Sequence, residues 1–576
     1  MHAVMQYMPG LQSLRHYRRS WLPRDVMAGI VLSTLLVPQG MAYAELAGLP
    51  AVTGLYTSVT CLVAYAIFGP SKVLVLGPDS SLGPMIAATI LPLMASGGDP
   101  AKAVALASML SLMTGAIMVA AGAGKLGFVA DLLSKPTILG YMNGLALTIV
   151  VGQLPKLLGF KVEADGFIGE VIGLFQGIAG GEVVWEAAAV GITCLLVILL
   201  MKRFIPRIPG VLVAVILGIA ATAYFDLAAK GVKVVGTLPQ GIPAPSIPFV
   251  PVGDALALAA GAFGIALVAL TDTISNATSF AERRGEEVDG DKEMIGIGAA
   301  NVITGFFQGF PVSTSSSRTA VAEQSGSKSQ VTGLVGAAVI TIMLFALPSL
   351  FADLPQPALG AVVIAAAISL ADVAAWRLLW SQRKADFVLS IVAFGGVVLF
   401  GVLPGIAIAI GMSVANVFRR VWWPYQATLG KVPHMAGWHD VELNEDAEVL
   451  PGATLFRFDG PLIFANSGTF RDRIRKLAEA QGEGGWIIVA AEPITDVDTT
   501  ACDMLDDLVA AQAAKGTRVV FAEMKSKVRD KLRLYGLEPE IPDENFYPTI
   551  RKAVEAYREQ TGADWQPANA GSQPDS

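Results

Sequence analysis

Two short polar segments interrupt a strongly apolar chain, and their residue types are suited to binding an anion. The first spans residues 77–81 (GPDSS), and the second spans residues 309–318 (GFPVSTSSSR). Each contains a proline in a turn, then hydroxyl side chains, then the start of a helical run. A helix that begins inside a membrane leaves unpaired backbone N–H groups and the positive end of its dipole there. Two such helix ends predict an anion site of the kind that secondary transporters build.

Serine hydroxyls in these segments are candidate substrate ligands because they can cap a helix or donate hydrogen bonds to an oxyanion. Ser316 and Ser317 are preferred in the second segment, since they lie nearest Arg318. A polar loop without a ligand is the alternative interpretation. The candidate serines are Ser80, Ser81, Ser315, Ser316 and Ser317.

Arg318 is expected to place a fixed positive charge beside both helix ends. A buried cation in a bilayer is costly and usually functional. The corresponding residue of the first segment, seven positions after Pro78, is Met85. The cation is therefore not common to both segments. The alternative is that Arg318 reaches the membrane interface or balances Glu323.

Two neutral donors and one acid accompany the first segment. Gln39 and Tyr43 lie one helical turn apart and can face the site together, or serve only helix packing. Asp79 is well placed to cap a helix but would repel an anionic substrate, so we interpret it as a cap.

Asp272 is the candidate ion-coupling residue. It lies in residues 264–280, which contain no other ionisable side chain, and Asn276 is one turn farther on the same face. An acid in such a place either titrates or binds a cation. With H⁺ or Na⁺ bound, Asp272 would repel an incoming anion less, which is a basis for co-transport. An acid that is simply hydrogen-bonded in the core is the alternative.

The composition places most of the chain in a membrane. Of 576 residues, 53% are hydrophobic and 15% charged, and the mean hydropathy is +0.57. Apolar runs long enough to span a bilayer recur. They begin near residues 26, 51, 79, 101, 137, 167, 183 and 210, and again near 252, 292, 313, 331, 356, 385 and 404. We predict fourteen membrane segments, with the weaker runs forming half-helices or surface helices.

Basic clusters predict the orientation, because they favour the cytoplasmic side. Residues 1–24 form a cytoplasmic lead-in without a signal peptide. Both termini are then cytoplasmic, and the protein is predicted to reside in a bacterial inner membrane. The clusters are Arg15 to Arg24, Lys202 with Arg203 and Arg207, Arg283 with Arg284, Arg377 with Arg383 and Lys384, and Arg419 with Arg420.

A matched spacing indicates an internal repeat. Gln39 precedes Pro78 by 39 residues, and Asp272 precedes Pro311 by the same distance. Seven segments per half, an odd number, would invert the second half in the membrane. The transport domain is predicted over residues 25–424, with repeats at about 25–230 and 251–420. Two unrelated proline turns are the alternative.

The long apolar runs end near residue 424, and residues 437–561 are predicted to form a small cytoplasmic α/β domain. Strands are expected at 454–458, 461–464, 486–491 and 517–523, and helices at 467–480, 499–513 and 525–535. Acidic side chains outnumber basic ones in this part of the chain. Residues 562–576 are polar and predicted to be disordered.

Several function classes receive no support from the sequence. Three scattered cysteines and four histidines have no metal-ligand spacing, so we predict no metal site apart from Na⁺ at Asp272. No phosphate-binding loop of the ATPase type is present. Neither a cofactor nor nucleic acid is expected, and the protein is not predicted to be an enzyme.

Six motifs in order along the chain resemble the signature of the SulP sulfate-permease family, which includes the animal multifunctional anion exchangers. The C-terminal domain is similar to STAS domains. The motifs are residues 36–44 (LVPQGMAYA), 54–56 (GLY), 77–80 (GPDS), 235–243 (VGTLPQGIP), 307–313 (FQGFPVS) and 315–320 (SSSRTA).

This resemblance implies a fold of seven plus seven inverted segments, divided into a core domain and a gate domain. The third and tenth segments would be half-helices facing one another, here opening at Asp79 and Ser313. The eighth segment of the family carries an acid at the position of Asp272, which implies ion coupling. Movement of the core against the gate, often within a homodimer, is also implied.

Residues 498–501 (DTTA) match the Asp-Ser-Ser-Gly type of loop in STAS anti-sigma antagonists, in which a serine is phosphorylated. Thr500 occupies that position. Threonine in place of serine, and alanine in place of glycine, favour a plain helix cap over a regulatory phosphorylation site.

The resulting prediction is a secondary transporter of a small anion, coupled to H⁺ or Na⁺. Sulfate comes first by family; bicarbonate and dicarboxylates come next, and chloride also suits the site. The expected partners are the anion, membrane lipids, a second copy of the chain and a soluble partner of the STAS domain. The alternatives are a nucleobase permease, a membrane sensor that signals through the STAS domain, and a channel-like conductor.

Overall fold

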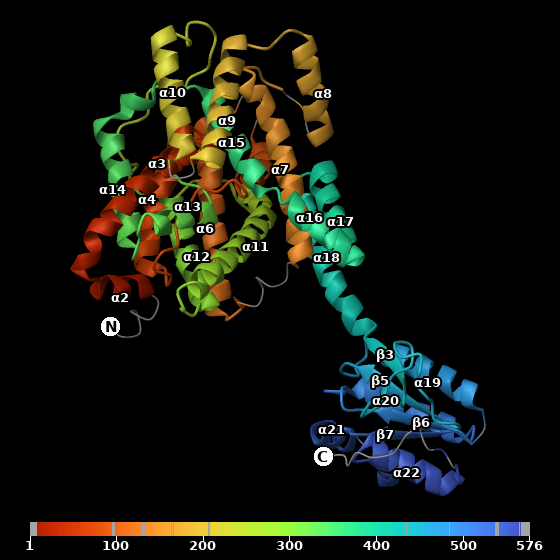
Figure 1. The fold of residues 1–576 in the computed structure, drawn as a ribbon. Helices are drawn as coiled ribbons and strands as arrows, with labels where there is room; N and C mark the ends of the chain where they lie inside the picture. The colour runs from red at the N-terminus through yellow and green to blue at the C-terminus, as the bar shows by residue number, and fades with distance from the viewer. Residues whose placement is uncertain are drawn as a thin grey trace. The chain divides into compact units, whose positions relative to one another are not determined.

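The computed structural model describes residues 8–94, 98–127, 134–162, 164, 166–205, 208–433, 435–482, 484–535, 541–563 and 565. The chain divides into two compact units, and the division falls between Val414 and Ala415. The first unit is helical, and the second is an α/β domain (Figure 1). This matches the predicted helical membrane domain followed by an α/β domain.

The first half of the helical unit runs from the N-terminus to residue 225. A 3-10 turn precedes its first long helix (Arg19–Trp21), and another follows its half-helix (Leu91–Leu93). Its elements are α2 (Pro9–Arg15), α3 (Leu22–Leu46), α4 (Ala51–Phe68), β1 (Leu76–Gly77), α5 (Gly83–Ile90), α6 (Pro100–Ala123), α7 (Lys135–Leu157), α8 (Gly166–Ala179), α9 (Trp185–Phe204) and α10 (Gly210–Phe225).

The second half repeats this order of long helices around a short strand and a half-helix. A 3-10 turn (Pro348–Phe351) follows its fourth segment. Its elements are α11 (Val252–Glu282), α12 (Gly290–Phe306), β2 (Ser313–Thr314), α13 (Ser316–Gln324), α14 (Val331–Ala346), α15 (Gln356–Leu370), α16 (Val373–Gln382), α17 (Lys384–Phe400) and α18 (Val402–Trp422).

Seven membrane segments are found in each half when the half-helices α5 and α13 are counted. Helices α8 and α16 are left over, and each lies between the fifth and sixth segments of its half. Both are amphipathic, as helices at a membrane surface are. Among the described residues, eight helical stretches are long and apolar enough to span a membrane, while α5, α8, α10 and α14 are shorter apolar helices.

The two halves meet at a small antiparallel sheet. Strand β1 pairs with β2, with Leu76 opposite Thr314 and Gly77 opposite Ser313. The half-helices begin only after these strands, at Gly83 and Ser316. The expected starts at Asp79 and Ser313 were therefore too early, because the extended backbone of the strands and the turn after β1 delay each helix.

Close helix packing fixes the position of α3 beside this sheet. A Cβ atom on Gly54 of α4 would lie 1.9 Å from the Gly40 carbonyl oxygen of α3. Only glycine permits this approach of two backbones. The contact holds the segment of α3 that carries Gln39 and Tyr43 against the core.

The second unit is a six-stranded sheet in the order β4-β3-β5-β6-β7-β8. Strand β3 is antiparallel to β4 and β5, and the remaining pairs are parallel. The strands are β3 (Tyr425–Gly430), β4 (His439–Asp440), β5 (Ala453–Asp459), β6 (Trp486–Ala490), β7 (Arg518–Ala522) and β8 (Phe546–Tyr547). The helices are α19 (Ser467–Gln481), α20 (Thr499–Ala513), α21 (Ser526–Leu534) and α22 (Ile550–Thr561), with a 3-10 turn at Asp543–Asn545.

Alternating strand residues supply two apolar cores. Side chains such as Phe456 and Val489 join residues of α19, α20 and α21 in one core. Their neighbours, including Leu455 and Ile488, pack with α22 in the other. The period of two along each strand places these sets on opposite faces of the sheet.

Most elements predicted for this unit are confirmed, but the strand expected at 461–464 is wrong. Only an isolated bridge between Leu462 and Val497 forms there, because the chain turns immediately into α19. Strands β3, β4 and β8 and helix α22 were not predicted. The expected disordered tail lies outside the described residues, except for residues 562, 563 and 565.

Candidate functional site

The β1–β2 pair brings the two polar turns together. The amide of Ser315 donates to the Val75 carbonyl at 3.2 Å, and the amide of Val75 donates to the Thr319 hydroxyl at 3.1 Å. The chain then turns into α5 on one side and α13 on the other. Both half-helix N-termini therefore start from one small sheet, as an anion site between two dipole ends requires.

A cavity of 570 Å³ lies against these turns. It is lined by ten of the eleven membrane residues singled out from the sequence, and Arg318 is the exception. It is also lined by Thr314, a hydroxyl residue of the second polar segment, and by Lys202, Ser275 and Ser369, which the sequence analysis did not propose as ligands. The predicted residues that line it are Gln39, Tyr43, Asp79, Ser80, Ser81, Asp272, Asn276, Ser315, Ser316 and Ser317.

Arg318 lies behind the cavity, between the two halves. Its side chain is 1% exposed. One guanidinium nitrogen, Nη1, donates to the Pro78 carbonyl at 2.6 Å, and Nη2 lies 3.7 Å from Oδ2 of Asp79. Neither Nη2 nor Nε has a hydrogen-bond partner. Glu323 instead pairs with Arg284 at 3.3 Å, so the expected alternative partner of Arg318 is already engaged.

Ser81 lies between two carboxylates. Oδ1 of Asp79 accepts hydrogen bonds from the Ser81 amide at 3.0 Å and from its hydroxyl at 2.8 Å. The same hydroxyl oxygen is 3.3 Å from Oδ2 of Asp272. One hydroxyl proton cannot serve both carboxylates fully. The arrangement thus suits a proton or a small cation at Asp272.

The carboxyl group of Asp79 organises the turn before α5, whereas the sequence analysis expected it to cap the helix. It satisfies Ser81 two residues on, while the residue at the N-cap position of the helix is Leu82. Asp79 therefore caps the turn rather than the helix itself.

Asn276 links α11 to the second turn. Its amide nitrogen donates to the Thr314 hydroxyl at 3.0 Å, and its amide oxygen accepts from the Ser316 hydroxyl. Asp272, one helical turn earlier, touches the first turn through Ser81. Helix α11 thus contacts both polar turns, and the shared face predicted for Asp272 and Asn276 is the one that meets them.

The serines of the second turn are not consumed by helix capping. Ser315 occupies the N-cap position of α13 without a side-chain capping bond. Its hydroxyl oxygen lies 3.2 Å from that of Ser317. Ser316 and Ser317 are exposed in the cavity, so their hydroxyls can reach a ligand there.

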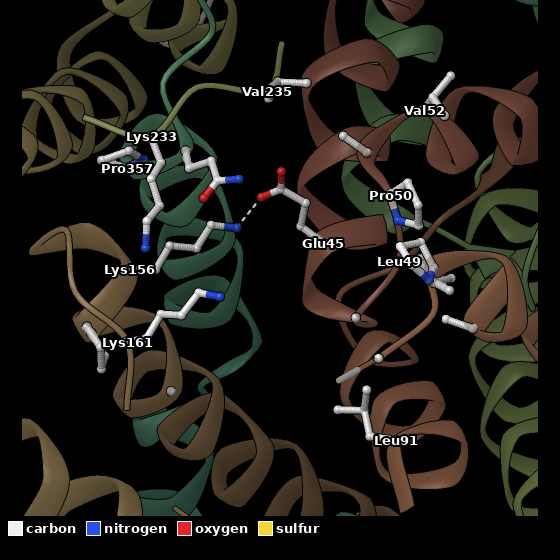
Figure 2. A pocket seen from close by; sticks show the side chains of 18 of the residues that line it. Glu45, Leu49, Pro50, Val52, Leu91, Lys156, Lys161, Lys233, Val235 and Pro357 are labelled. Atoms are coloured by element: carbon white, nitrogen blue, oxygen red, sulfur yellow. Dashed lines mark hydrogen bonds and ion pairs between the residues drawn. The ribbon is translucent and has the colours of Figure 1, made fainter. Parts of the chain in front are cut away.

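A second cavity, of 1160 Å³, lies at the other ends of several of the same helices. Figure 2 shows Lys156 of α7 pointing to Glu45 of α3, with which it forms an ion pair. Lys161 and Lys233 lie on the Lys156 side of this cavity. The ion-pair side chains are 22% and 13% exposed for Lys156 and Glu45. The only sequence signal for this pair was a charge at the end of each apolar run.

The loop that carries Thr500 in the second unit is held by Asp498. Oδ1 of Asp498 accepts from the Ala501 amide at 2.8 Å and so caps α20; Oδ2 accepts from the Phe464 amide at 2.7 Å. Thr500 is exposed in the first turn. Nearby, the hydrogen bond from Lys531 lowers the pKa of Asp496 below its usual range.

Metal-ligand clusters are absent from the described part of the chain, since no group of three or more His, Cys, Asp or Glu side chains gathers there. Asp272 alone remains as a candidate cation ligand, together with hydroxyl and amide oxygens around it.

Comparisons with known proteins agree with the fold and with the motifs. The sulfate permease family matches residues 22–393, and the STAS domain matches residues 444–553. A probable sulfate transporter of Mycobacterium tuberculosis is 37% identical over 551 residues, which cover 96% of this chain and 98% of the relative. Sulfate transporter 1.2 of Arabidopsis thaliana is 29% identical, with 96% and 88% covered.

Two solved structures share the fold. The murine anion transporter Solute Carrier 26 family member A9, in its inward-facing state, has a TM-score of 0.87 at 23% identity, covering 97% of this chain and 95% of that one. The transmembrane domain of the cyanobacterial bicarbonate transporter BicA has a TM-score of 0.59 at 22% identity, covering 69% and 98%. The fold is thus that of seven plus seven inverted segments with core and gate domains. The chain belongs to the sulfate permease family and carries a C-terminal STAS domain.

Proposed function

We propose that the protein is a secondary active transporter of a small anion, and that the anion binds in the 570 Å³ cavity. The observation that carries this proposal is the β1–β2 pair, which joins two half-helix starts beside hydroxyl side chains that have no capping role. Backbone N–H groups, helix dipoles and hydroxyls together suit an oxyanion. Arg318 adds a fixed charge behind the site rather than a direct ligand.

Sulfate is the first candidate substrate, because the relatives that match nearly the whole chain are named sulfate transporters. Bicarbonate follows from the bicarbonate transporter with the same fold, and dicarboxylates such as succinate fit the same donors. A nucleobase is less suited, since an uncharged base gains nothing from Arg318.

Asp272 is the proposed coupling residue, with H⁺ or Na⁺ as the ion. It shares the Ser81 hydroxyl with Asp79, so a bound proton or cation would relieve the crowding of two carboxylates. Neutralising Asp272 would also make room for a negative substrate. Anion and coupling ion would thus favour each other's binding.

The transport movement is proposed to be elevator-like, with the core moving against the gate in a homodimer. Lys202 and residues 208–211, which line the anion cavity, belong to a basic region that the positive-inside tendency places in the cytoplasm. The cavity would then face inward, and both termini would be cytoplasmic in an inner membrane.

The boundaries proposed for the chain are 1–24 for the N-terminal segment, 25–424 for transport and 437–561 for the STAS domain. A soluble partner of the STAS domain, with Thr500 as a regulatory position, is proposed on the exposure of that residue at the start of α20.

The test is uptake of labelled anions into proteoliposomes under imposed H⁺ or Na⁺ gradients. Sulfate, bicarbonate, succinate and chloride form the panel, with uracil as the nucleobase control. Saturable, gradient-dependent uptake of one anion is expected. Uptake of uracil alone would favour the permease, unsaturable current would favour a channel, and anion binding without any flux would favour a sensor.

A further inference from the structure

Asp79 is an unexpected residue at an anion site. Its carboxyl lies in the cavity wall, beside the turn that leads into α5. A carboxylate there repels the anion that the helix ends attract. Its turn-forming bonds to Ser81 could be supplied by an asparagine, whose side-chain oxygen also accepts. The negative charge itself therefore requires an explanation.

The explanation lies in its position beside Arg318. Asp79 is the only ion-pair partner of Arg318 among the described residues, at 3.7 Å. The arginine is 1% exposed and the aspartate 15%, so water screens the pair weakly. The other contact of the guanidinium is a neutral carbonyl, that of Pro78. The charge of Arg318 is thus balanced locally by Asp79.

The positions of Asp79 and Arg318 within the two repeats indicate that the two residues act together. By the offset that relates Pro78 to Pro311, Asp79 corresponds to Val312, and Arg318 corresponds to Met85. Each half contributes one charge where the other half has an apolar residue. Neither charge is needed to build a half-helix, because α5 forms in the half that lacks the arginine and α13 forms in the half that lacks the aspartate.

We propose that Asp79 makes anion binding require the coupling ion, because it offsets the charge of Arg318. This inference rests on the proposed transport function and names a second residue for its coupling. Arg318 and Asp79 cancel, so the net charge of the site follows Asp272 alone. With Asp272 ionised, the three side chains sum to one negative charge and repel the anion. With H⁺ or Na⁺ bound at Asp272 they sum to zero, and the helix ends attract it.

Other titratable groups around the site do not change this balance. Tyr43 of α3 and Lys202 of α9 line the same cavity, and Tyr141 of α7 lies near Asp272 in a small adjoining space. The tyrosines are neutral. Lys202 is exposed, so solvent screens its charge.

Asp79→Asn is the primary test, in the full-length protein reconstituted in liposomes. The variant keeps an acceptor for Ser81 but leaves Arg318 unbalanced. Binding of labelled sulfate is measured at acidic and alkaline pH, each with and without Na⁺. Without the coupling ion, affinity of the variant is expected to rise by roughly tenfold over wild type. The three side chains of the variant sum to zero without the coupling ion, as those of wild type do with it, so the variant should bind sulfate without the ion about as tightly as wild type binds it with the ion.

Asp79→Asn combined with Arg318→Gln is the matched rescue. The double variant has the same net charge as wild type in both states of Asp272, so its affinity without the coupling ion should fall back to the wild-type value. Size-exclusion profiles and thermal unfolding verify that each variant is folded.

The inference is overturned if folded Asp79→Asn, without the coupling ion, binds sulfate no more tightly than wild type does, or if the double variant keeps the raised affinity. It is also overturned if Asp79→Asn binds sulfate more weakly in every condition. A different result, in which wild type binds none of the panel anions under any gradient, would instead reject the proposed function.

Discussion

Two cavities of the helical unit share the helices α3, α7 and α15 but differ in chemistry. Helix α3 contributes Leu35, Gln39 and Tyr43 to the anion cavity and Glu45 to the lysine-lined cavity. Helices α7 and α15 likewise line one cavity near one end and the other near the opposite end. Hydroxyl side chains and the starts of the half-helices line the anion cavity. Three lysines line the second, and the ion pair between Glu45 and Lys156 joins α3 to α7 there.

The two cavities differ in whether their polar side chains are already paired with one another. Hydroxyl groups of the second turn that make no capping hydrogen bond can bind a ligand. The charges of Glu45 and Lys156 are instead paired with each other. In an alternating-access transporter, an ion pair between two helices can hold its own side closed while the opposite cavity is accessible. We expect the Glu45–Lys156 pair to have this role. Each prediction below tests this division, beginning with the largest expected effect.

Arg318→Gln should weaken anion binding by roughly 100-fold or more, because it removes one member of a buried charge pair and leaves Asp79 unbalanced. Arg318→Lys, which keeps the charge, should retain part of the affinity. Labelled-sulfate binding to the purified protein measures both. Unchanged affinity in a folded Arg318→Gln protein would mean that the anion cavity is not organised by this cation.

Asp272→Asn should remove accumulation against a gradient while preserving anion exchange. Asparagine keeps an acceptor near Ser81 but can neither bind a proton nor present a charge. Accumulation in proteoliposomes is expected to fall to about the external concentration. Asp254→Asn is the control, since this acid lies on the same helix but pairs with Lys102 at 3.3 Å. Concentrative uptake by Asp272→Asn would place coupling elsewhere.

Glu45→Gln should favour opening of the lysine-lined cavity. The pair is partly buried, and its loss should shift the equilibrium by about 1 kcal/mol, a factor of roughly five. A cysteine introduced at Lys233, which lines this cavity, would report the change as faster labelling. The exchanged pair Glu45→Lys with Lys156→Glu should restore slow labelling. Equal rates in all variants would show that the ion pair is not a gate.

Ten of the residues singled out from the sequence line one cavity, whereas no sequence pattern pointed to the lysine-lined cavity, for a physical reason. A proline turn followed by serines, and an acid inside an apolar span, are conspicuous because a membrane penalises polar groups. Glu45 and Lys156 lie at the ends of apolar runs, where a charge is ordinary. Only the packing of α3 near α7 makes them partners, and no local pattern encodes that contact.

The direction in which the Arg318 side chain points could not be predicted from the sequence either. Its charge and its nearness to the second turn were evident, and a fixed positive charge beside both helix ends was expected, but the contacts of its side chain were not. The strand pairing of Gly77 with Ser313 turns the side chain toward the carbonyl of Pro78. A two-residue strand has too little pattern to be predicted, yet it decides which side chains face the cavity.

The smallest effect is expected from exposed lysines, and one is chosen from each cavity: Lys202 and Lys233. Lys202→Gln should lower the association rate of the anion from the side of the anion cavity, and Lys233→Gln from the opposite side. Each change should be about two- to threefold at low ionic strength and should vanish at high salt, because exposed charges act by steering. Uptake into right-side-out and inside-out vesicles distinguishes the sides. If both variants slowed uptake from the same side, the two cavities could not be the two entrances of one pathway.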